Sequence, residues 1–146
     1  MPDGMRKVMV VEDSDDYAFL LTRALNHSRR FSIVWRAKDG QEAMAYLGGT
    51  GQFSDRDRFP LPDAVLLDIL LPKKSGFEVL EWLTKQPQMP IVVMLTVLEN
   101  NSQRQKALNA GAHAFDVKPY DDKGLANFIR WLDEFIGKSA TPSGAR

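Results

Sequence analysis

Short apolar runs rich in β-branched residues alternate along the chain with segments in which apolar residues recur at helical spacing. The runs with the composition of buried strands cover residues 7–11, 31–35, 64–67, 91–95 and 112–117. The helical segments cover residues 18–25, 41–47, 76–85, 101–110 and 125–136. This alternation predicts one α/β domain, in which helices cover both faces of a doubly wound, five-stranded parallel sheet.

Two segments depart from this regular pattern. Residues 48–62 contain three glycines and two prolines, which predicts a long surface loop. The helical segment 101–110 is apolar only at Ala107 and Leu108, so we expect it to be weakly anchored to the sheet.

The composition fits one globular domain, since 44% of the 146 residues are hydrophobic and 26% are charged. We place the domain at residues 5–137 and expect a disordered tail at 138–146. The absence of cysteine excludes disulfides and thiolate sites, and no run reaches the length of a membrane span, so we expect a cytoplasmic protein. Basic and acidic residues both number 19, which argues against direct binding of nucleic acid.

Polar residues with chemical potential stand where the predicted strands end. Glu12 and Asp13 follow the first strand, Asp68 the third, Thr96 the fourth and Lys118 the fifth. Because the carboxyl ends of parallel strands meet at one edge of a sheet, we expect these side chains to converge. Each residue alone is more often a helix cap, a turn residue or a surface charge, so the hypothesis depends on the joint pattern.

The converging residues have the chemistry of a phosphoryl-transfer site. Three carboxylates at one edge repel one another unless a cation is present, and their oxygens suit Mg²⁺. Lysine and threonine supply hydrogen-bond donors for the oxygens of a phosphoryl group, and an aspartate carboxylate can act as nucleophile. The neighbouring Asp15 and Asp16 are expected to be solvated acids at the start of a helix.

Five motifs together resemble the receiver domain of bacterial two-component response regulators. They are Val10-Val11-Glu12-Asp13, Leu-Asp-Ile-Leu-Leu-Pro-Lys-Lys-Ser-Gly at residues 67–76, Leu95-Thr96, Gly111-Ala112, and Phe-Asp-Val-Lys-Pro at residues 115–119. The resemblance covers residues 5–137, and it implies the flavodoxin-like strand order 2-1-3-4-5.

The resemblance also implies roles for the acidic residues. Asp68 would be the phosphoacceptor, and Asp13, Asp68 and the main-chain carbonyl of Leu70 would hold Mg²⁺. Glu12 would act on the metal through a bound water. The protein would then catalyse only its own phosphorylation and dephosphorylation, so we do not expect an enzyme with an external product.

Three further residues take roles in signalling by the same resemblance. Lys118 would pair with a phosphoryl oxygen, Thr96 would swing inward to bond another, and Phe115 matches the aromatic switch position. In this family the bond that matches Lys118-Pro119 is commonly cis. The signal would be a population shift in which Phe115 follows Thr96 and the weakly anchored helix moves.

Two leucines stand where the family often tunes the lifetime of the phosphoryl group. Leu70 and Leu98 lie two residues past Asp68 and Thr96, and neither side chain can orient a water. We therefore predict slow self-dephosphorylation. The alternative is that these leucines only cover the pocket.

The resemblance implies a sensor histidine kinase as the partner that donates the phosphoryl group. No effector domain follows in this sequence, so we expect a stand-alone regulator whose output is contact with a downstream protein. The loop at 48–62, the Leu-Pro-Lys-Lys-Ser-Gly segment and the Trp-Leu-Asp-Glu-Phe-Ile end are similar to small regulators that partner phytochrome kinases. Trp131 falls off the apolar stripe of its helix, so it either belongs to a homodimer or partner surface or is partly covered by the tail of its own chain.

Other functions fit the residues less well. A pseudo-receiver that binds partners without phosphorylation is the main alternative, although all five site residues are present. A phosphatase of the haloacid dehalogenase class would need its nucleophile after the first strand, whereas Asp68 follows the third. Residues 48–51 lack the Gly-Lys-Ser/Thr ending of a nucleotide-binding loop, and His27 and His113 lack metal-ligand spacing.

Overall fold

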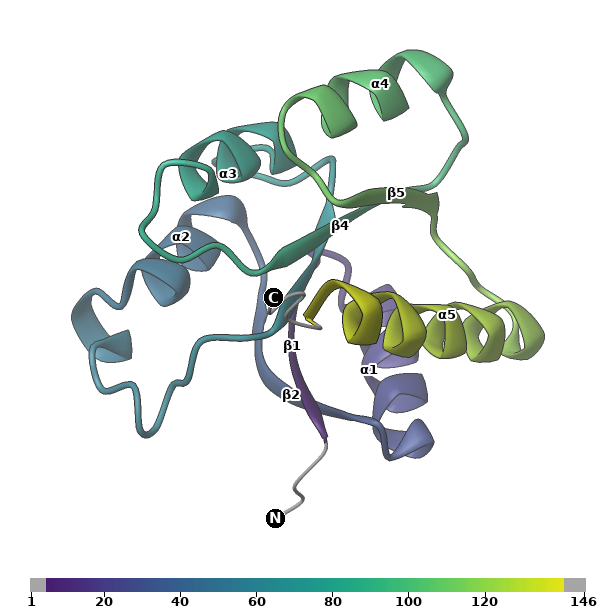
Figure 1. Cartoon of the computed structure of the whole chain (residues 1–146), viewed down its shortest axis with the longest axis horizontal. Helices are drawn as coiled ribbons and strands as arrows, with labels where there is room; N and C mark the ends of the chain where they lie inside the picture. Colours follow the sequence, from purple (N-terminus) through teal and green to yellow (C-terminus); the bar gives the residue numbers. More distant parts are fainter. Residues whose placement is uncertain (1–4, 141–146) are drawn as a thin grey trace.

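A computed structural model describes residues 5–140 and has a single five-stranded parallel sheet with the order β2-β1-β3-β4-β5 (Figure 1). The strands are β1 (Arg6–Val11), β2 (Phe31–Ala37), β3 (Ala64–Asp68), β4 (Ile91–Thr96) and β5 (Ala114–Val117). The helices are α1 (Asp15–Ser28), α2 (Gly40–Gly48), α3 (Gly76–Leu83), α4 (Asn101–Asn109) and α5 (Asp122–Ala140). The predicted fold class and strand order are confirmed.

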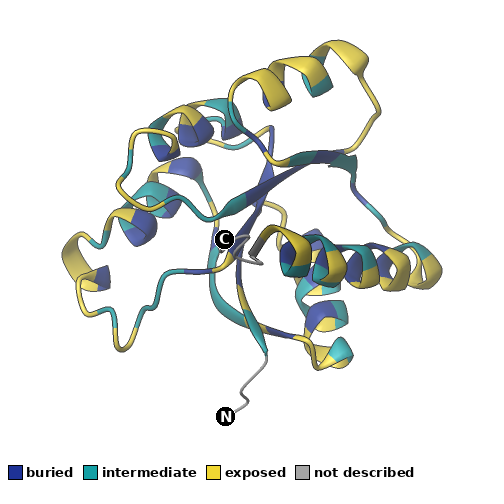
Figure 2. Ribbon diagram, in the orientation of Figure 1, coloured by how far each residue is buried: buried dark blue, intermediate teal, exposed yellow. Residues whose placement is uncertain are grey.

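Both faces of the sheet are covered by helices, and alternate residues of a strand contribute to opposite cores. On β1, Val8 and Val10 pack with apolar residues of α1 and α5. Met9 and Val11 pack on the other face with residues of α2 and α3. Figure 2 shows the buried positions concentrated on the strands and on the inner sides of the helices. The central strands are therefore buried on both sides, which explains their continuous apolar runs.

The starts of α1 and α3 are fixed by side chains next to the predicted site. The Ser14 hydroxyl accepts a hydrogen bond from the amide of Tyr17 at 3.2 Å and caps α1 directly after the acidic pair. Ser75 and Glu78 form a reciprocal capping box at the start of α3. These caps hold the β1–α1 and β3–α3 connections in defined conformations.

The segment between α2 and β3 differs from its predicted structure. Gly51–Phe53 form a short 3-10 helix, η1, and Phe53 is only 3% exposed. Phe53 packs with Trp35, Tyr46 and Phe59, and the ring centroids lie 4.9 to 6.1 Å apart. We call these four residues the aromatic cluster. The predicted surface loop is mostly exposed, but it is not fully irregular, because Phe53 and Phe59 anchor an otherwise polar segment.

An arginine closes the same segment against the end of α2. The guanidinium of Arg56 donates to the main-chain carbonyls of Tyr46, Leu47 and Phe59 at 2.8 to 3.1 Å. These carbonyls include two at the C-terminal end of the helix, where the backbone has no partner within the helix. The long connection is thus held by buried rings and by charge-assisted hydrogen bonds.

The remaining elements lie close to their predicted bounds. Ala107 is the only buried residue of α4, which agrees with the predicted weak anchoring of this helix. Helix α5 continues through Ala140, so the first three residues of the predicted tail are helical, because they extend an uninterrupted helix. Residues 141–146 of that tail lie outside the described residues. Within residues 5–140, no helix combines the length and apolar character needed to cross a membrane.

Candidate functional site

The strand ends bring all five predicted site residues into one pocket. Glu12 and Asp13 directly follow β1, Asp68 and Thr96 are the last residues of β3 and β4, and Lys118 directly follows β5. All five line a pocket with a volume of about 440 Å³ at the carboxyl edge of the sheet. The predicted convergence of these residues is confirmed, because a parallel sheet places its carboxyl ends side by side.

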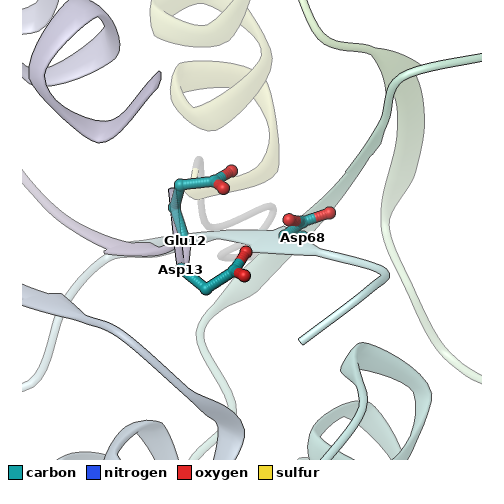
Figure 3. Close-up of side chains that lie close together, drawn as sticks. All are labelled: Glu12, Asp13 and Asp68. Carbon is teal, nitrogen blue, oxygen red and sulfur yellow. The ribbon is translucent and has the colours of Figure 1, made fainter. Parts of the chain in front are cut away.

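The three acidic side chains point toward one another (Figure 3). Carboxylate oxygens of Glu12, Asp13 and Asp68 all lie within 4.8 Å of one another. Glu12 and Asp68 are buried, whereas Asp13 is exposed to solvent. The amide of Ser14 donates to Glu12 Oε2 at 3.0 Å, and the amide of Leu70 donates to Asp68 Oδ1 at 3.3 Å. Main-chain donors therefore orient two of the acids.

Lys118 supplies the counter-charge inside the pocket. Its Nζ lies 2.8 Å from Glu12 Oε1 and 3.1 Å from Asp68 Oδ2. Burial favours the neutral amine, but the hydrogen bonds and charges of the two acids outweigh that effect and raise the pKa of Lys118. The lysine therefore stays charged in this buried position.

The environment of Asp68 opposes its ionisation. Burial raises the pKa of Asp68 to about 6, the negative charge of Glu12 adds to the increase, and Lys118 opposes it. The positive charge of Lys118 therefore compensates only part of the negative charge of the three neighbouring carboxylates.

The donor set fits a divalent cation. All three candidate ligands are hard carboxylate oxygens, and with a single lysine beside them the ionised pocket carries excess negative charge. Mg²⁺ binds a small number of carboxylates and completes its shell with water, and the exposure of Asp13 leaves the site open to solvent. The Leu70 amide already contacts Asp68, while the role of the Leu70 carbonyl stays a prediction.

The two residues predicted to act as a switch lie on neighbouring strands. Thr96 is 8% exposed and lines the pocket, and its main-chain carbonyl accepts a hydrogen bond from the amide of Lys118 at 2.7 Å. Phe115 is buried on β5. The guanidinium of Arg104, from α4, lies 5.2 Å from the Phe115 ring centroid and donates to the Phe115 carbonyl at 3.0 Å. The weakly anchored helix therefore contacts the aromatic residue directly.

The bond that is commonly cis in the family is trans in this chain. All peptide bonds of the described residues are trans, including the bond between Lys118 and Pro119. The trans isomer is the more stable form of an ordinary X-Pro bond, by about 0.5–1 kcal/mol.

Tyr17 is a site residue that the sequence reasoning did not single out. It lines the pocket, and its hydroxyl donates to the Pro119 carbonyl at 2.9 Å. Lys118 Nζ lies 4.9 Å from the centroid of the Tyr17 ring, and burial raises the pKa of the phenol. An aromatic residue three positions after Ser14, on the inner side of α1, was the only signal in the sequence.

Three of the exposed apolar side chains lie at the pocket. Leu70 and Leu98 are 71% and 75% exposed, and Phe19, Val97 and Tyr120 are also largely exposed. Leu70, Val97 and Tyr120 line the pocket itself. The exposure of Asp13 and Leu70 shows that the pocket is open to solvent.

Close packing of the backbone explains why the last residue of the Lys-Lys-Ser-Gly motif, at position 76, is a glycine. A Cβ atom at Gly76 would collide with the main-chain carbonyl of Asp68 and lie 2.9 Å from Cα of Ile69. The amide of Gly76 donates to the Ile69 carbonyl at 2.9 Å. The missing side chain therefore lets the start of α3 pack directly against the segment that presents Asp68.

The remaining sequence candidates lie outside the pocket or at its edge. His27 is exposed, and His113 precedes β5, where its Nδ1 accepts from the amide of Val92 at 3.0 Å. Asp15 and Asp16 are exposed at the start of α1, as predicted. Trp131 is half-buried and stacks on Phe135 of its own helix.

Comparison with known proteins gives a family match for most of the chain. The family model described as the response regulator receiver domain matches residues 8–130. Transcriptional regulatory protein CpxR of Klebsiella pneumoniae is 32% identical over 126 residues, which is 86% of this chain and 48% of that protein. The chain spans about half the length of the curated relatives it matches.

Solved structures show the same similarity at the level of the fold. The phosphorylated cyanobacterial phytochrome response regulator RcpA is 29% identical, with a TM-score of 0.80 over 94% of this chain and 97% of that chain. The Mn²⁺-bound form of response regulator Rcp1 is 28% identical, with a TM-score of 0.74 over 89% of this chain and 93% of that chain.

Proposed function

The chain belongs to the response regulator receiver family, and from this membership we propose that it accepts a phosphoryl group from a histidine kinase on Asp68. The reaction depends on a divalent metal and changes the conformation that a protein partner recognises. Like other receivers, it would turn over no external substrate and would catalyse only its own phosphorylation and dephosphorylation.

The observation that carries this proposal is the shared pocket of Asp68, Lys118 and two further acids. Asp68 lies at the sheet edge with one carboxylate oxygen bonded to Lys118 and the other to the Leu70 amide. A carboxylate held from both sides is oriented for attack before a donor arrives. Glu12 and Asp13 have no part in that attack, but they complete a set of oxygen ligands.

Each side chain has a defined task in the transfer. A carboxylate oxygen of Asp68 forms the bond to phosphorus as the bond from phosphorus to the histidine nitrogen of the donor breaks. Lys118 and the Thr96 hydroxyl donate hydrogen bonds to the phosphoryl oxygens. Glu12, Asp13 and Asp68 would hold Mg²⁺, which when bound supplies positive charge against the charge of the phosphoryl group.

The signal follows from the position of Thr96 on β4, which pairs with the strand that carries Phe115. Bonding of the Thr96 hydroxyl to the phosphoryl group draws the end of β4 inward, and Phe115 moves into the released space. Arg104 contacts Phe115 and lies on α4, whose only buried residue is Ala107. The equilibrium position of α4 therefore changes on phosphorylation, and a protein partner reads that surface.

A phytochrome-type kinase is the donor we propose. The cyanobacterial relative of known structure is described as a phytochrome response regulator, and its similarity extends over 94% of this chain. Phosphotransfer from a purified phytochrome kinase, compared with a kinase that senses no light, tests this choice.

The decisive experiment is the intact mass of the protein after incubation with acetyl phosphate. We expect one phosphoryl adduct that requires Mg²⁺ and disappears in D68N. D57N is the matched control, because Asp57 is an exposed aspartate of the α2–β3 connection and the same substitution there leaves the pocket intact.

Two results would reject the proposal. An adduct that persists in D68N would place the acceptor elsewhere. Absence of any adduct, from acetyl phosphate and from a kinase, would favour a pseudo-receiver that binds its partner without phosphorylation.

A further inference from the structure

Arg36 on β2 lies beside the acidic pocket and has no part in the function proposed above. The sheet register pairs Arg36 with Val10 of β1, two residues before Glu12. The arginine side chain is 21% exposed, so most of it lies within the protein. Its position therefore places a fixed positive charge next to the turn that carries two of the three acids.

The guanidinium makes two contacts with this turn. Its Nε donates to the main-chain carbonyl of Glu12 at 2.9 Å, and Nη1 lies 2.9 Å from Asp15 Oδ1. The third nitrogen, Nη2, is buried and has no hydrogen-bond partner among the residues that the structure describes. One side chain thus bridges the end of β1 and the first residue of α1.

Simple stabilisation explains this arrangement poorly. Asp15 is 77% exposed, and an ion pair with an exposed partner contributes little to folding. A buried donor without a partner costs stability. A positive charge near a cation site also works against cation binding. The remaining explanation for an arginine at this position is the geometry of its hydrogen bond to the Glu12 carbonyl.

That carbonyl belongs to the backbone between the two acids. Fixing it restricts the peptide that links Glu12 to Asp13, and therefore the directions of both carboxylates. On the opposite side of the turn, the Glu12 amide donates to the Ala37 carbonyl at 2.9 Å. The turn is thus held to β2 at both its amide and its carbonyl.

We propose that Arg36 is a positioning residue for the divalent cation, because its guanidinium fixes the Glu12 carbonyl and thereby aims Glu12 and Asp13 into the pocket. The inference rests on the proposed function, in which these acids hold the metal. Groups that orient metal ligands typically change metal affinity by about 10- to 100-fold when they are replaced.

The test measures Mn²⁺ binding by electron paramagnetic resonance of the free ion in wild type, R36Q, R36K and K38Q. Mn²⁺ serves as the probe because it takes the same oxygen ligands as Mg²⁺. R36K keeps the charge but loses the planar fork. K38Q removes one charge from the exposed Lys38, two residues away, and leaves the turn intact. Thermal melting in EDTA reports the stability of each metal-free variant.

We expect the Kd for Mn²⁺ to rise roughly tenfold in both R36Q and R36K and to stay unchanged in K38Q. Tighter binding by R36Q together with wild-type binding by R36K would show that only charge matters, and would overturn the inference. A lower melting temperature with unchanged Kd would also overturn it, because the role would be purely structural. R36K carries the test if R36Q does not fold.

The two proposals fail in different ways. Wild-type protein that binds no Mn²⁺ would reject the metal site itself, and the inference with it. Normal Mn²⁺ binding and phosphorylation in wild type, with unchanged binding in both Arg36 variants, would reject only the role of Arg36.

Discussion

The carboxylate of Asp68 illustrates how a functional residue can work against the stability of its own fold. It is 7% exposed and lies next to Glu12, and its pKa is raised to about 6 by burial first and by that neighbouring charge second. Lys118 offsets only part of this effect. The protein keeps an unfavourable charge where the chemistry needs a nucleophile.

This conflict predicts a pH-dependent difference between wild type and D68N. Because the folded pKa lies above the unfolded value of 3.8, the stability linked to protonated Asp68 is present below that value and is lost as the pH rises through about 6. In metal-free protein we expect equal stabilities near about pH 4, and a D68N variant more stable by at most about 3 kcal/mol at about pH 8. Urea unfolding in EDTA measures both values, and a less stable D68N at the higher pH would contradict the prediction.

Leu70 leads to a prediction on the lifetime of the phosphoryl group. Its side chain lines the pocket and offers no polar atom to an attacking water. We expect L70N to shorten the lifetime several-fold, short of the roughly hundredfold effect of a well-placed general base. The decay of the phosphorylated mass with time measures it. L70A is the control, because it opens the pocket without adding a polar group.

The two outcomes of that control separate the interpretations of Leu70. If L70A keeps the wild-type lifetime, the missing polar group explains the slow hydrolysis. If L70A loses phosphate as fast as L70N, the leucine acts only as a cover.

Single residues also show which parts of the site the sequence could predict. Glu12, Asp13 and Asp68 were found because a strand that ends in an acid has a known position in a parallel sheet. Tyr17 and Arg36 were not, since their contacts cross from one element to another. Their roles depend on side-chain directions and on the register of β1 with β2, which no local pattern encodes.

At the scale of elements, the connection between α2 and β3 is mostly exposed but contributes Phe53 and Phe59 to the core. The aromatic cluster joins a strand, a helix and this connection, and the Trp35 indole donates to Glu42 at 3.2 Å. Composition predicted a loop because glycine, proline and charged residues dominate it. Residues 48–62 contain only two phenylalanines. Two aromatic residues among fifteen positions do not form a periodic pattern that would indicate burial.

The aromatic cluster predicts a large effect at Phe53. Replacement by alanine leaves a cavity among three rings, so we expect F53A to lower the free energy of unfolding by about 3 kcal/mol. Denaturant unfolding measures the change. Q52A is the control, since Gln52 is exposed in the same short helix. A loss below about 1 kcal/mol in F53A would show that the connection is dispensable to folding.

In helices α4 and α5, unlike in the α2–β3 connection, the sequence pattern predicted how far each element is buried. Helix α5 has a clear apolar stripe, and its core-facing residues Leu132 and Ile136 are buried as the spacing indicates. Helix α4 has one buried residue, and the sequence already predicted its weak attachment. Its contact to Phe115 through Arg104 could not be predicted, because an arginine in a polar helix normally faces solvent.

At the scale of the whole molecule, one surface predicts self-association. Trp131 and Phe135 of α5 are half-buried and stack with ring centroids 4.9 Å apart, on the same helix as exposed polar residues. A symmetric dimer would cover this pair.

We therefore expect a dimer in the presence of beryllofluoride, an analogue of the bound phosphoryl group. Size-exclusion chromatography with light scattering measures the mass with and without the analogue. W131A should remain monomeric, whereas W82A, which alters a half-buried tryptophan of α3, should dimerise as the wild type does. A wild-type monomer under both conditions would contradict the prediction.

The strand order has a consequence for the protein while it is being made. Glu12 and Asp13 leave the ribosome before the other site residues, but β1 needs β2 and β3 as neighbours, and Lys118 follows the last strand of the sheet. A nascent chain therefore carries the acids long before it carries the ammonium group that balances them. Arrested chains that stop before residue 118 would hold this charge uncompensated, so the pocket is completed only once the residues after β5 have been made.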